Sequence, residues 1–385
     1  MSIIDHARYF TNLPRDYYLS TDRYNREIEA IYGHQWLYVA HSSQVREKGD
    51  YFACDLPGGE SVIVVRGDEG RVNAFHNVCR HRGFSLCDLG TGNTKVFVCP
   101  YHRWSYDVNG RLRSAAPVAN GQCFDYEDYG LKPVRMEIWR GFIFVNFSAE
   151  VPEPLGPRFD AVAPDMVRIE PERLKLAHHK VYPIESNWKF VLENYIECSH
   201  CKSVHSSTLC VPMDIDAIFA EVGEYIKPAE INPMFIPTKE GSKSLSLDGR
   251  LVSTKLLGEF GRGVAPPNAF GTGFMIMPAI TGALFQSDYG VVHRVDPVSP
   301  TKTLLHNWWF VHEDAVEGVD YSLDNLLAVW DKTDLEDCKI LERQQRGAQS
   351  RGFGPGPHDP NREGTMRAGL ELYLGMMGEA AAPTS

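Results

Sequence analysis

The sequence predicts an α+β protein with two domains, and three observations support this. The chain has 385 residues, which is more than one simple hydrophobic core usually organises. Short β-type runs separated by turn residues fill the stretch from about residue 45 to residue 147, as expected for a small antiparallel β domain. A helix-like stretch precedes that region, and both strand-like and helix-like segments follow it.

The first predicted element is a helix from Thr21 to Tyr38, within residues 1–40. Its apolar side chains recur at helical spacing, at Ile28, Ile31, Tyr32 and Trp36. Residues 41–150 are assigned to the β domain, because turn sequences such as Pro57-Gly58-Gly59 separate its apolar runs. These runs are Tyr51–Leu56, Ser61–Arg66, Val72–Val78, Lys95–Cys99 and Gly141–Phe147.

The proline-rich segment Val151–Pro157 is predicted to be a linker, and residues 151–385 are predicted to form the larger domain. A helix is expected over Trp188–His200, and a long final helix from about Asp320 to Arg346, which contains neither Gly nor Pro. The Ala-rich tail from Gly378 is expected to be irregular. The predicted strands are Leu174–Tyr182, Gly271–Pro278, Gly282–Ser287 and Thr303–His312.

Composition narrows the classes of function. A formal net charge of −11 argues against a nucleic-acid-binding protein, which would carry a basic surface. No targeting signal is recognised, and the longest apolar run, Phe274–Phe285, is too short to span a membrane. The nine cysteines are an odd number, which argues against a disulfide framework and favours a reducing, cytoplasmic compartment where clustered cysteines bind metals.

The strongest motif pairs Cys79-Arg-His81 with Cys99-Pro-Tyr-His102. Two thiolates and two imidazoles suit either Zn²⁺ or a [2Fe–2S] cluster that has the cysteines on one iron and the histidines on the other. A zinc finger more usually places its cysteines together and its histidines together. The spacing therefore favours the iron–sulfur cluster, with zinc as the alternative.

The two loops, residues 79–83 (Cys-Arg-His-Arg-Gly) and 99–104 (Cys-Pro-Tyr-His-Arg-Trp), resemble the cluster-binding loops of Rieske non-haem iron oxygenases. The resemblance implies a Rieske antiparallel β domain inserted into a catalytic domain whose antiparallel sheet is covered by helices. It also implies a [2Fe–2S] cluster held by Cys79, His81, Cys99 and His102. Arg103 departs from the family pattern, where Gly is common.

A second motif, Glu197-x2-His200-x4-His205, can supply the two histidines of a 2-His-1-carboxylate Fe(II) site. It resembles the mononuclear iron motif of the same family, which makes His200 and His205 ligands. Positions five apart on a helix diverge by about 140°, so we expect the helix to kink, bulge or end between them. The alternative is a zinc site that uses Cys198, Cys201 and His205.

The third ligand is expected on the final helix. On a helical wheel Asp337 lies at the centre of the apolar stripe, whereas Glu336 and Glu342 point away from it. A carboxylate on a buried face is costly unless it is paired or binds a metal, so Asp337 is the predicted ligand. Asp334 is the second choice, and a buried Asp paired with Arg or Lys is the alternative.

The residues around Glu197 resemble most closely the carnitine, glycine betaine and stachydrine oxygenases, whereas ring-hydroxylating dioxygenases usually have Asp at this position. The resemblance implies a monooxygenase that uses O2 to hydroxylate or N-demethylate a quaternary ammonium or N-methylated substrate. It also implies that Glu197 bridges the two metal sites across a subunit boundary. An aromatic-ring-hydroxylating dioxygenase is the alternative, and a non-catalytic Rieske electron carrier is a more distant one.

The resemblance also implies a homotrimer and a separate flavin/iron–sulfur reductase. No Gly-x-Gly-x-x-Gly motif follows a predicted strand, so NAD(P)H is expected to be used by that reductase rather than by this chain. Arg80, Arg82 and Arg103 could form the docking surface for the reductase, although each could equally be ordinary solvated charge. An aromatic pocket would bind a quaternary ammonium through cation–π attraction. The candidates for its wall are Tyr195, Phe285, Trp308 and Trp309, each of which could instead be core.

Overall fold

The computed structural model describes residues 10–115, 124–222, 229–234, 236–267, 270–359 and 361–379. These residues pack as two compact units, of which the larger comprises the described parts of Met1–Tyr32 and Gly156–Ser385, and the smaller is Gly33–Leu155. Within the described ranges, no helix is both long enough and apolar enough to cross a membrane. Of the tail expected to be irregular, residues 380–385 lie outside the described residues, whereas Glu379 pairs with Arg23 at 3.1 Å.

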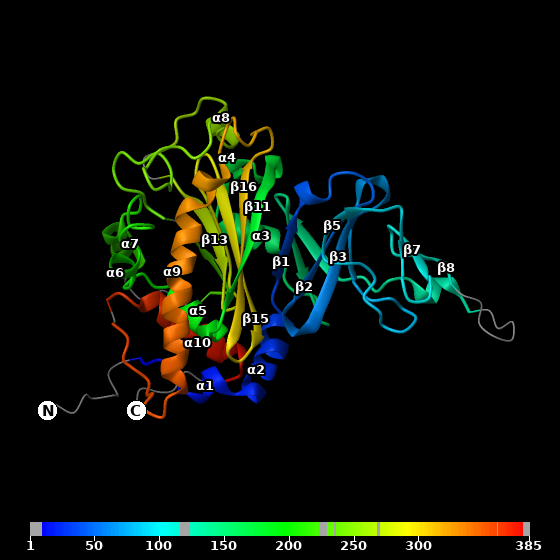
Figure 1. Cartoon of the computed structure of the whole chain (residues 1–385), viewed down its shortest axis with the longest axis horizontal. Helices are drawn as coiled ribbons and strands as arrows, with labels where there is room; N and C mark the ends of the chain where they lie inside the picture. The colour runs from blue at the N-terminus through cyan, green and yellow to red at the C-terminus, as the bar shows by residue number, and fades with distance from the viewer. Residues whose placement is uncertain are drawn as a thin grey trace. The chain divides into compact units, whose positions relative to one another are not determined.

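The smaller unit consists of three antiparallel sheets (Figure 1). Strand β1 (Leu37–His41) belongs to this unit because it pairs with β10 (Phe142–Asn146), which in turn pairs with β9 (Arg135–Trp139). A second sheet has the order β4-β3-β2-β5, and a third has the order β6-β7-β8. Their bounds are Val72–His76, Glu60–Arg66, Asp50–Leu56, Gly90–Asn93, Val96–Val98, Ser105–Asp107 and Leu112–Ser114.

The larger unit is organised around a six-stranded sheet in which every neighbouring pair is antiparallel. The strand order is β11-β16-β15-β14-β13-β12. Strands β13 and β14 are buried along their whole length, as their apolar sequences require. In the same order, the bounds are Leu174–Ile184, Lys302–His312, Gly290–Ser299, Thr281–Phe285, Thr272–Ile276 and Ile231–Pro233.

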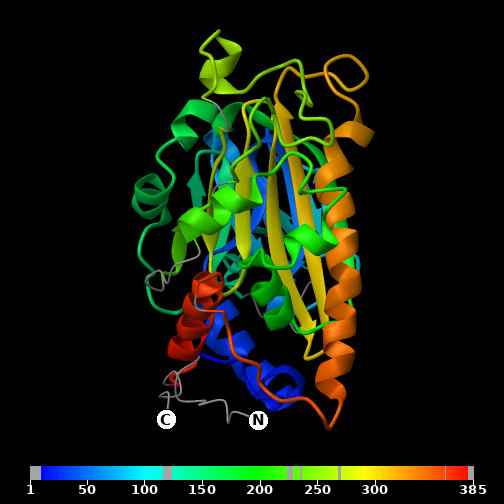
Figure 2. The ribbon, with the colours of Figure 1, turned by 90° about the vertical axis from the view of Figure 1, so that its left-hand side faces the viewer.

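Helices cover this sheet (Figures 1 and 2). The longest, α9 (Leu323–Gln349), begins with Ser322 as its N-cap and packs along β11 and α5 (Trp188–Tyr195). Its buried side chains recur at spacings of three, four and seven residues, as expected for a helix with one buried face. The other helices are α1 (Asp16–Leu19), α2 (Thr21–Glu27), α3 (Leu155–Val162), α4 (Met166–Ile169), α6 (Cys201–Val204), α7 (Ile215–Val222), α8 (Gly258–Gly261) and α10 (Gly364–Met376).

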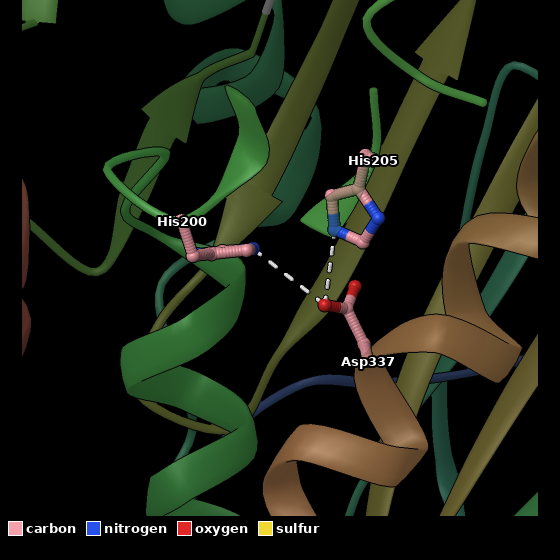
Figure 3. A group of neighbouring side chains, drawn as sticks. All are labelled: His200, His205 and Asp337. Carbon is pink, nitrogen blue, oxygen red and sulfur yellow. Dashed lines mark ion pairs between the residues drawn. The ribbon is translucent and has the colours of Figure 1, made fainter. Parts of the chain in front are cut away.

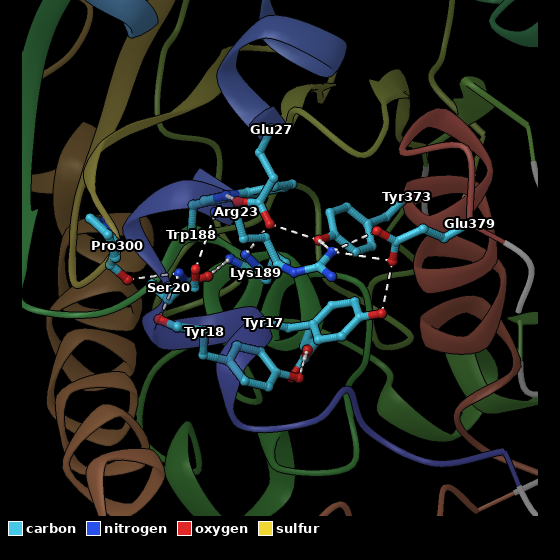
Figure 4. Close-up of polar contacts among 12 residues, drawn as sticks. Tyr17, Tyr18, Ser20, Arg23, Glu27, Trp188, Lys189, Pro300, Tyr373 and Glu379 are labelled. Carbon is cyan, nitrogen blue, oxygen red and sulfur yellow. Dashed lines mark hydrogen bonds and ion pairs between the residues drawn. The ribbon is translucent and has the colours of Figure 1, made fainter. Parts of the chain in front are cut away.

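A buried ion pair fixes helix α5 against the N-terminal helices (Figure 4). Lys189 Nζ lies 2.7 Å from Glu27 Oε1, and both side chains are completely buried. The indole N–H of Trp188 and the hydroxyl of Tyr373 donate to the same carboxylate, at 2.8 and 2.7 Å. Such a pair stabilises a fold only when further hydrogen bonds satisfy its charges, as they do here. The network positions the helix that leads into the candidate site.

The α+β fold class predicted from the sequence is confirmed, with differences in detail. The predicted helix Thr21–Tyr38 is wrong at its C-terminal end, because α2 gives way to a π-helical segment, Ile28–Tyr32, and then to β1. Strand β15 and helix α10 were not predicted. Helix α10 contains Gly364, Gly369 and Gly375, which weaken a helical signal, and packing in the folded unit overrides that weak propensity.

Candidate functional site

Two loops of the smaller unit share one backbone pattern. The amide of Cys79 donates to the carbonyl of Phe84, and that of Gly83 donates back to Cys79. In the second loop the amide of Cys99 donates to Trp104, and that of Arg103 donates back to Cys99. The two motifs in the sequence therefore fold into a matched pair of turns.

The cysteine and histidine side chains of these two loops lie at opposite ends of the site. The Cys79 and Cys99 side chains are buried, and burial together with the neighbouring Cys99 thiol raises the pKa of Cys79. The His81 and His102 rings lie 4.6 Å apart toward solvent, with His81 exposed and stacked on the Trp104 ring. Two thiols at the inner end and two imidazoles at the outer end match the donor set of a Rieske-type [2Fe–2S] cluster.

The backbone at position 103 explains why Gly is common there in the family. Arg103 has φ +63°, and Gly83, its counterpart in the first loop, has φ +75°. The left-handed conformation suits Gly and is strained for a residue with a Cβ atom. Arg103 therefore adopts a conformation that the second loop imposes on it.

In the larger unit, the second motif begins where helix α5 ends. The helix stops at Tyr195, an irregular segment carries Glu197, and the short helix α6 separates His200 from His205. The expectation that no single straight helix carries both histidines is confirmed. The break, however, comes before His200 rather than between the two histidines, because α5 ends earlier than predicted.

The chain brings His200, His205 and Asp337 together (Figure 3). One ligand atom of each lies within 4.8 Å of the others. Asp337 Oδ1 lies 3.5 Å from His200 Nε2 and 3.1 Å from His205 Nε2. His205 Nε2 is buried and has no hydrogen bond among the described residues. Two imidazole nitrogens aimed at one carboxylate fit the donor set of a 2-His-1-carboxylate metal site.

Each of the two histidines has a carboxylate at its Nδ1 atom. His200 Nδ1 lies 2.5 Å from Glu197 Oε1, and His205 Nδ1 lies 2.8 Å from Glu336 Oε2. Because an ionised carboxylate only accepts, each Nδ1 carries the hydrogen and each Nε2 presents its lone pair to the shared centre. Metal-binding histidines are usually oriented by such a carboxylate. The hydroxyl of Thr208 also donates to Glu336, at 2.7 Å.

One sequence-based expectation in this region is wrong, and one alternative is excluded. Glu336 was expected to point away, but its long side chain reaches past the helix flank to His205. Cys198 and Cys201 are joined in a disulfide, so they are not available as thiolates for the alternative zinc site. The sequence argued against a disulfide framework, and this bond joins only two residues three apart in the chain, while Cys210 nearby is a free thiol.

Asp334, the second choice for the third ligand, lies one helical turn before Asp337 and is buried. It accepts a hydrogen bond from the Asn307 amide at 2.5 Å, and Asn307 contacts the buried His293 at 2.7 Å. Burial, reinforced by the Asp337 carboxylate, raises the pKa of Asp334 well above its usual value. Asp334 is therefore a largely desolvated carboxylate beside the proposed ligands rather than one of them.

These residues open into a cavity of about 410 Å³. Of the four aromatic residues suggested by the sequence, only Tyr195 lines it, because Phe285, Trp308 and Trp309 belong to the buried core. Trp330 is the indole on its wall. Carboxylates on the wall come from Glu197, Asp334 and Asp337, and among the lining residues that the structure describes Arg362 supplies the one guanidinium or ammonium group.

The sequence reasoning missed four residues of this site: Asn194, Trp330, Glu336 and Arg362. Asn194 Nδ2 lies 3.2 Å from both His200 Nε2 and Asp337 Oδ1. Trp330 was detectable, since it shares the helical face of Asp334 and Asp337. Arg362 had no local signal, because it comes from the segment before α10 and reaches the cavity only in the folded unit.

Comparison with known families matches both units. A model described as "Rieske [2Fe-2S] domain" matches residues 35–126, and a model described as "Ring hydroxylating alpha subunit (catalytic domain)" matches residues 171–379. The second match alone covers more than half of the chain.

Curated relatives are similar over most of their length. A glycine betaine monooxygenase oxygenase subunit from Chromohalobacter salexigens is 33% identical over 374 residues, covering 90% of this chain and 81% of the relative. A carnitine monooxygenase oxygenase subunit from Acinetobacter pittii is 28% identical, with 94% and 92% covered. A crystal structure of the quaternary ammonium Rieske monooxygenase CntA with L-carnitine has a TM-score of 0.71 at 24% identity, covering 98% of this chain and 99% of that one, and shows the same fold.

Proposed function

This chain belongs to the family of ring-hydroxylating alpha subunits with a Rieske domain, and on that premise we propose that it oxidises an N-methyl group of a quaternary ammonium substrate. It is the oxygenase subunit of a Rieske-type monooxygenase, with a [2Fe–2S] cluster and a mononuclear iron as its cofactors. Hydroxylation of an N-methyl carbon gives a carbinolamine, which releases formaldehyde and leaves the demethylated amine.

The mononuclear iron is proposed to bind to His200, His205 and Asp337. The support is the convergence of the two Nε2 atoms on one Asp337 oxygen and the buried, unsatisfied Nε2 of His205. Three protein ligands would leave room at the iron for O2 and substrate. When bound, the iron would supply the activation of O2. Cys79, His81, Cys99 and His102 are the proposed cluster ligands.

The protein's own contribution is to orient these ligands and to hold the substrate. Glu197 and Glu336 fix the rotation and the tautomer of His200 and His205 through their Nδ1 atoms. Glu197 also lines the cavity and lies outside any helix. We propose that Glu197 carries a second role, in which its carboxylate links the mononuclear site to the cluster of a neighbouring subunit in a homotrimer.

The composition of the cavity carries the substrate proposal. The side chains of Trp330 and Tyr195 and the buried carboxyl group of Asp334 line the same cavity as the ligand group. A quaternary ammonium has no N–H to donate, so it is bound through aromatic faces and a nearby negative charge rather than through hydrogen bonds. The named activities of the glycine betaine and carnitine relatives agree with this substrate class.

A separate reductase that takes electrons from NAD(P)H is proposed as the partner. The sequence suggested Arg80, Arg82 and Arg103 for its docking surface. Arg80 is committed in part to the fold, because its guanidinium donates to the Gly130 carbonyl at 2.7 Å. Arg82 and Arg103 are exposed near the cluster loops and are the better candidates.

The test combines the iron-loaded protein with a reductase, NADH and O2. Glycine betaine, carnitine and related N-methyl compounds should consume O2 and release formaldehyde in equal amounts. A panel in which only aromatic compounds react, giving cis-diols, would replace this proposal with the aromatic dioxygenase alternative. Iron analysis should give two cluster irons and one mononuclear iron per chain.

A second experiment tests the bridging role of Glu197 against the orienting role of Glu336. Alanine at either position removes a carboxylate from one histidine, so both variants should lose some iron affinity. With iron resupplied, Glu197→Ala should still reduce its cluster but fail to pass electrons to substrate oxidation, whereas Glu336→Ala should recover coupled turnover. Equal recovery by both variants would eliminate the bridging role.

A further inference from the structure

The cavity beside the ligand group is lined by both acidic and basic side chains. Asp334 and Arg362 both line it, and they come from different parts of the chain, the middle of α9 and the segment before α10. Resting on the proposed function, we infer that the cavity recognises a zwitterion: Asp334 faces the ammonium of the substrate and Arg362 pairs with its carboxylate. The two residues would then determine the preference for betaines over amino alcohols.

Asp334 is placed to face a cation at the inner end of the cavity. Its side chain is buried, and its one carboxylate–amide hydrogen bond, from Asn307, satisfies only part of its capacity to accept. A buried carboxylate is costly unless a positive group compensates it. The neighbouring carboxylates of Asp337 and Asp331 add to that cost, so a substrate cation in the cavity would relieve it.

The surroundings of Asp334 suit a quaternary ammonium in particular. Trp330 precedes it by one turn of α9 and lies on the same cavity wall, and Tyr195 lines the cavity from α5. Aromatic faces attract a cation that cannot donate a hydrogen bond. Asp337, the proposed metal ligand, follows Asp334 by three residues, which is about 4.5 Å along the helix axis. An ammonium held here would bring one of its methyl groups next to the ligand group.

Arg362 is placed at the opening of the same cavity. Its side chain is exposed to solvent and yet contributes to the cavity wall. Thr365, in the first turn of α10, lines the wall beside it. A guanidinium matches the two oxygens of a carboxylate with a pair of parallel N–H donors. An alcohol or an uncharged tail in the same position would gain much less from that contact.

Together, the two ends of the cavity distinguish compounds of the same shape. A betaine can contact Asp334 and Arg362 at once, whereas choline can make only the contact with Asp334. The cavity wall also includes Leu209, Met213 and Met275, which are apolar and suit a short alkyl spacer. The charge layout therefore selects by the combination of charges rather than by size.

Four probe compounds of similar shape distinguish the contact with Asp334 from the contact with Arg362. Glycine betaine carries both charges, choline carries only the cation, 3,3-dimethylbutyrate replaces the ammonium nitrogen with carbon and keeps only the carboxylate, and 3,3-dimethylbutanol carries neither. Binding of each to the anaerobic iron-loaded protein is measured by calorimetry. The variants are Arg362→Gln and Asp334→Asn, with Arg351→Gln and Asp324→Asn as matched controls. Arg351 and Asp324 are both exposed, and neither lines the cavity.

Arg362→Gln should weaken glycine betaine and 3,3-dimethylbutyrate by about tenfold and leave choline nearly unchanged. Asp334→Asn should weaken glycine betaine and choline by about tenfold and leave 3,3-dimethylbutyrate nearly unchanged. Both controls should match the wild type for all four probes. If Asp334→Asn does not fold, the wild type still tests this end of the cavity, because choline should bind about tenfold tighter than 3,3-dimethylbutanol.

An Arg362→Gln protein that weakens choline and glycine betaine equally would overturn the role of Arg362. Equal binding of choline and 3,3-dimethylbutanol by the wild type would overturn that of Asp334. Formaldehyde release by the wild type is scored separately. Selective binding without oxidation of any N-methyl probe would refute the proposed function and keep the charge assignment. Oxidation of an N-methyl probe without the selective losses of binding in the two variants would keep the proposed function and refute the charge assignment.

Discussion

Glu336 offers a quantitative test of how the protein holds its proposed metal site. Its carboxylate accepts from His205 Nδ1 at 2.8 Å, and Thr208 donates to the same oxygen at 2.7 Å. Neither residue is a proposed ligand, so any effect on iron binding must act through His205. The perturbation is a pair of substitutions, Glu336→Gln and Glu336→Ala.

The structure sets the expected size of the effect. Removing a carboxylate that orients a metal-binding histidine typically costs 10–100-fold in metal affinity, which is about 1.4–2.7 kcal/mol. Glu336→Gln keeps an oxygen that can accept from His205 but loses the negative charge, so we expect about a tenfold loss. Glu336→Ala also leaves the Nδ1–H of a buried ring without an acceptor, and we expect about a hundredfold loss.

The assay is a competition between the protein and a chelator for Fe(II) under anaerobic conditions, which gives the iron dissociation constant. Thr208→Val removes only the hydroxyl that steadies Glu336 and should cause a smaller loss than either Glu336 variant. Glu342→Gln, on the same helix and absent from the cavity wall, is the matched control. The absorption of the Rieske cluster serves as an internal reference, because its ligands belong to the other unit.

Two results would refute the reasoning. A Glu336→Ala protein that binds iron as tightly as the wild type would show that His205 needs no carboxylate behind it. A loss of cluster absorption in parallel with the iron would show that the substitution disturbs the whole fold rather than one histidine.

Three further predictions concern stability. Lys189→Met should lower the free energy of unfolding by about 3–5 kcal/mol, because it leaves the Glu27 charge buried without its partner. Adding Glu27→Gln should recover much of that loss, as measured by urea titration. A double variant no more stable than Lys189→Met would contradict this explanation. Burial raises the pKa of Glu193 to about 7 from 4.5, so the folded state holds a proton that the unfolded chain releases between these values, and stability falls as pH rises through this window. Glu193→Gln should remove on the order of 3 kcal/mol of that fall between pH 5 and pH 8, and an unchanged slope would reject the assignment. Arg103→Gly should raise the stability of the smaller unit by about 1 kcal/mol and Gly83→Ala should lower it by about 1–2 kcal/mol, measured by thermal loss of cluster absorption; opposite signs would show that the left-handed backbone is not what limits these loops.

Local motifs were enough to identify much of the candidate site. Cys79 and His81, like His200 and His205, lie close together in the sequence, so the chemistry of their donor atoms can be read without knowing the fold. Asp337 was found from helical periodicity, because a regular helix places residues three and four apart on one face. Family membership agrees with these motifs.

Helical periodicity could not predict how far a side chain reaches or where a helix ends. A helical wheel gives the direction of the Cβ atom, but the rest of the Glu336 side chain extends back to His205. The wheel also assumes a continuous helix, whereas α5 ends at Tyr195 and a turn brings Glu197 to His200. The Cys198–Cys201 bond depends on that same turn.

The sequence by itself determined the fold class, the family and the types of donor atom, since these depend on short motifs and on the pattern of apolar residues along single elements. Only the tertiary structure decided which side chains share the cavity. Phe285, Trp308 and Trp309 were buried by the sheet, while Trp330 and Arg362 were brought to the cavity wall. The physical reason is that the wall is built from segments far apart in the chain, and their meeting depends on how whole elements pack to bury apolar surface rather than on any local signal.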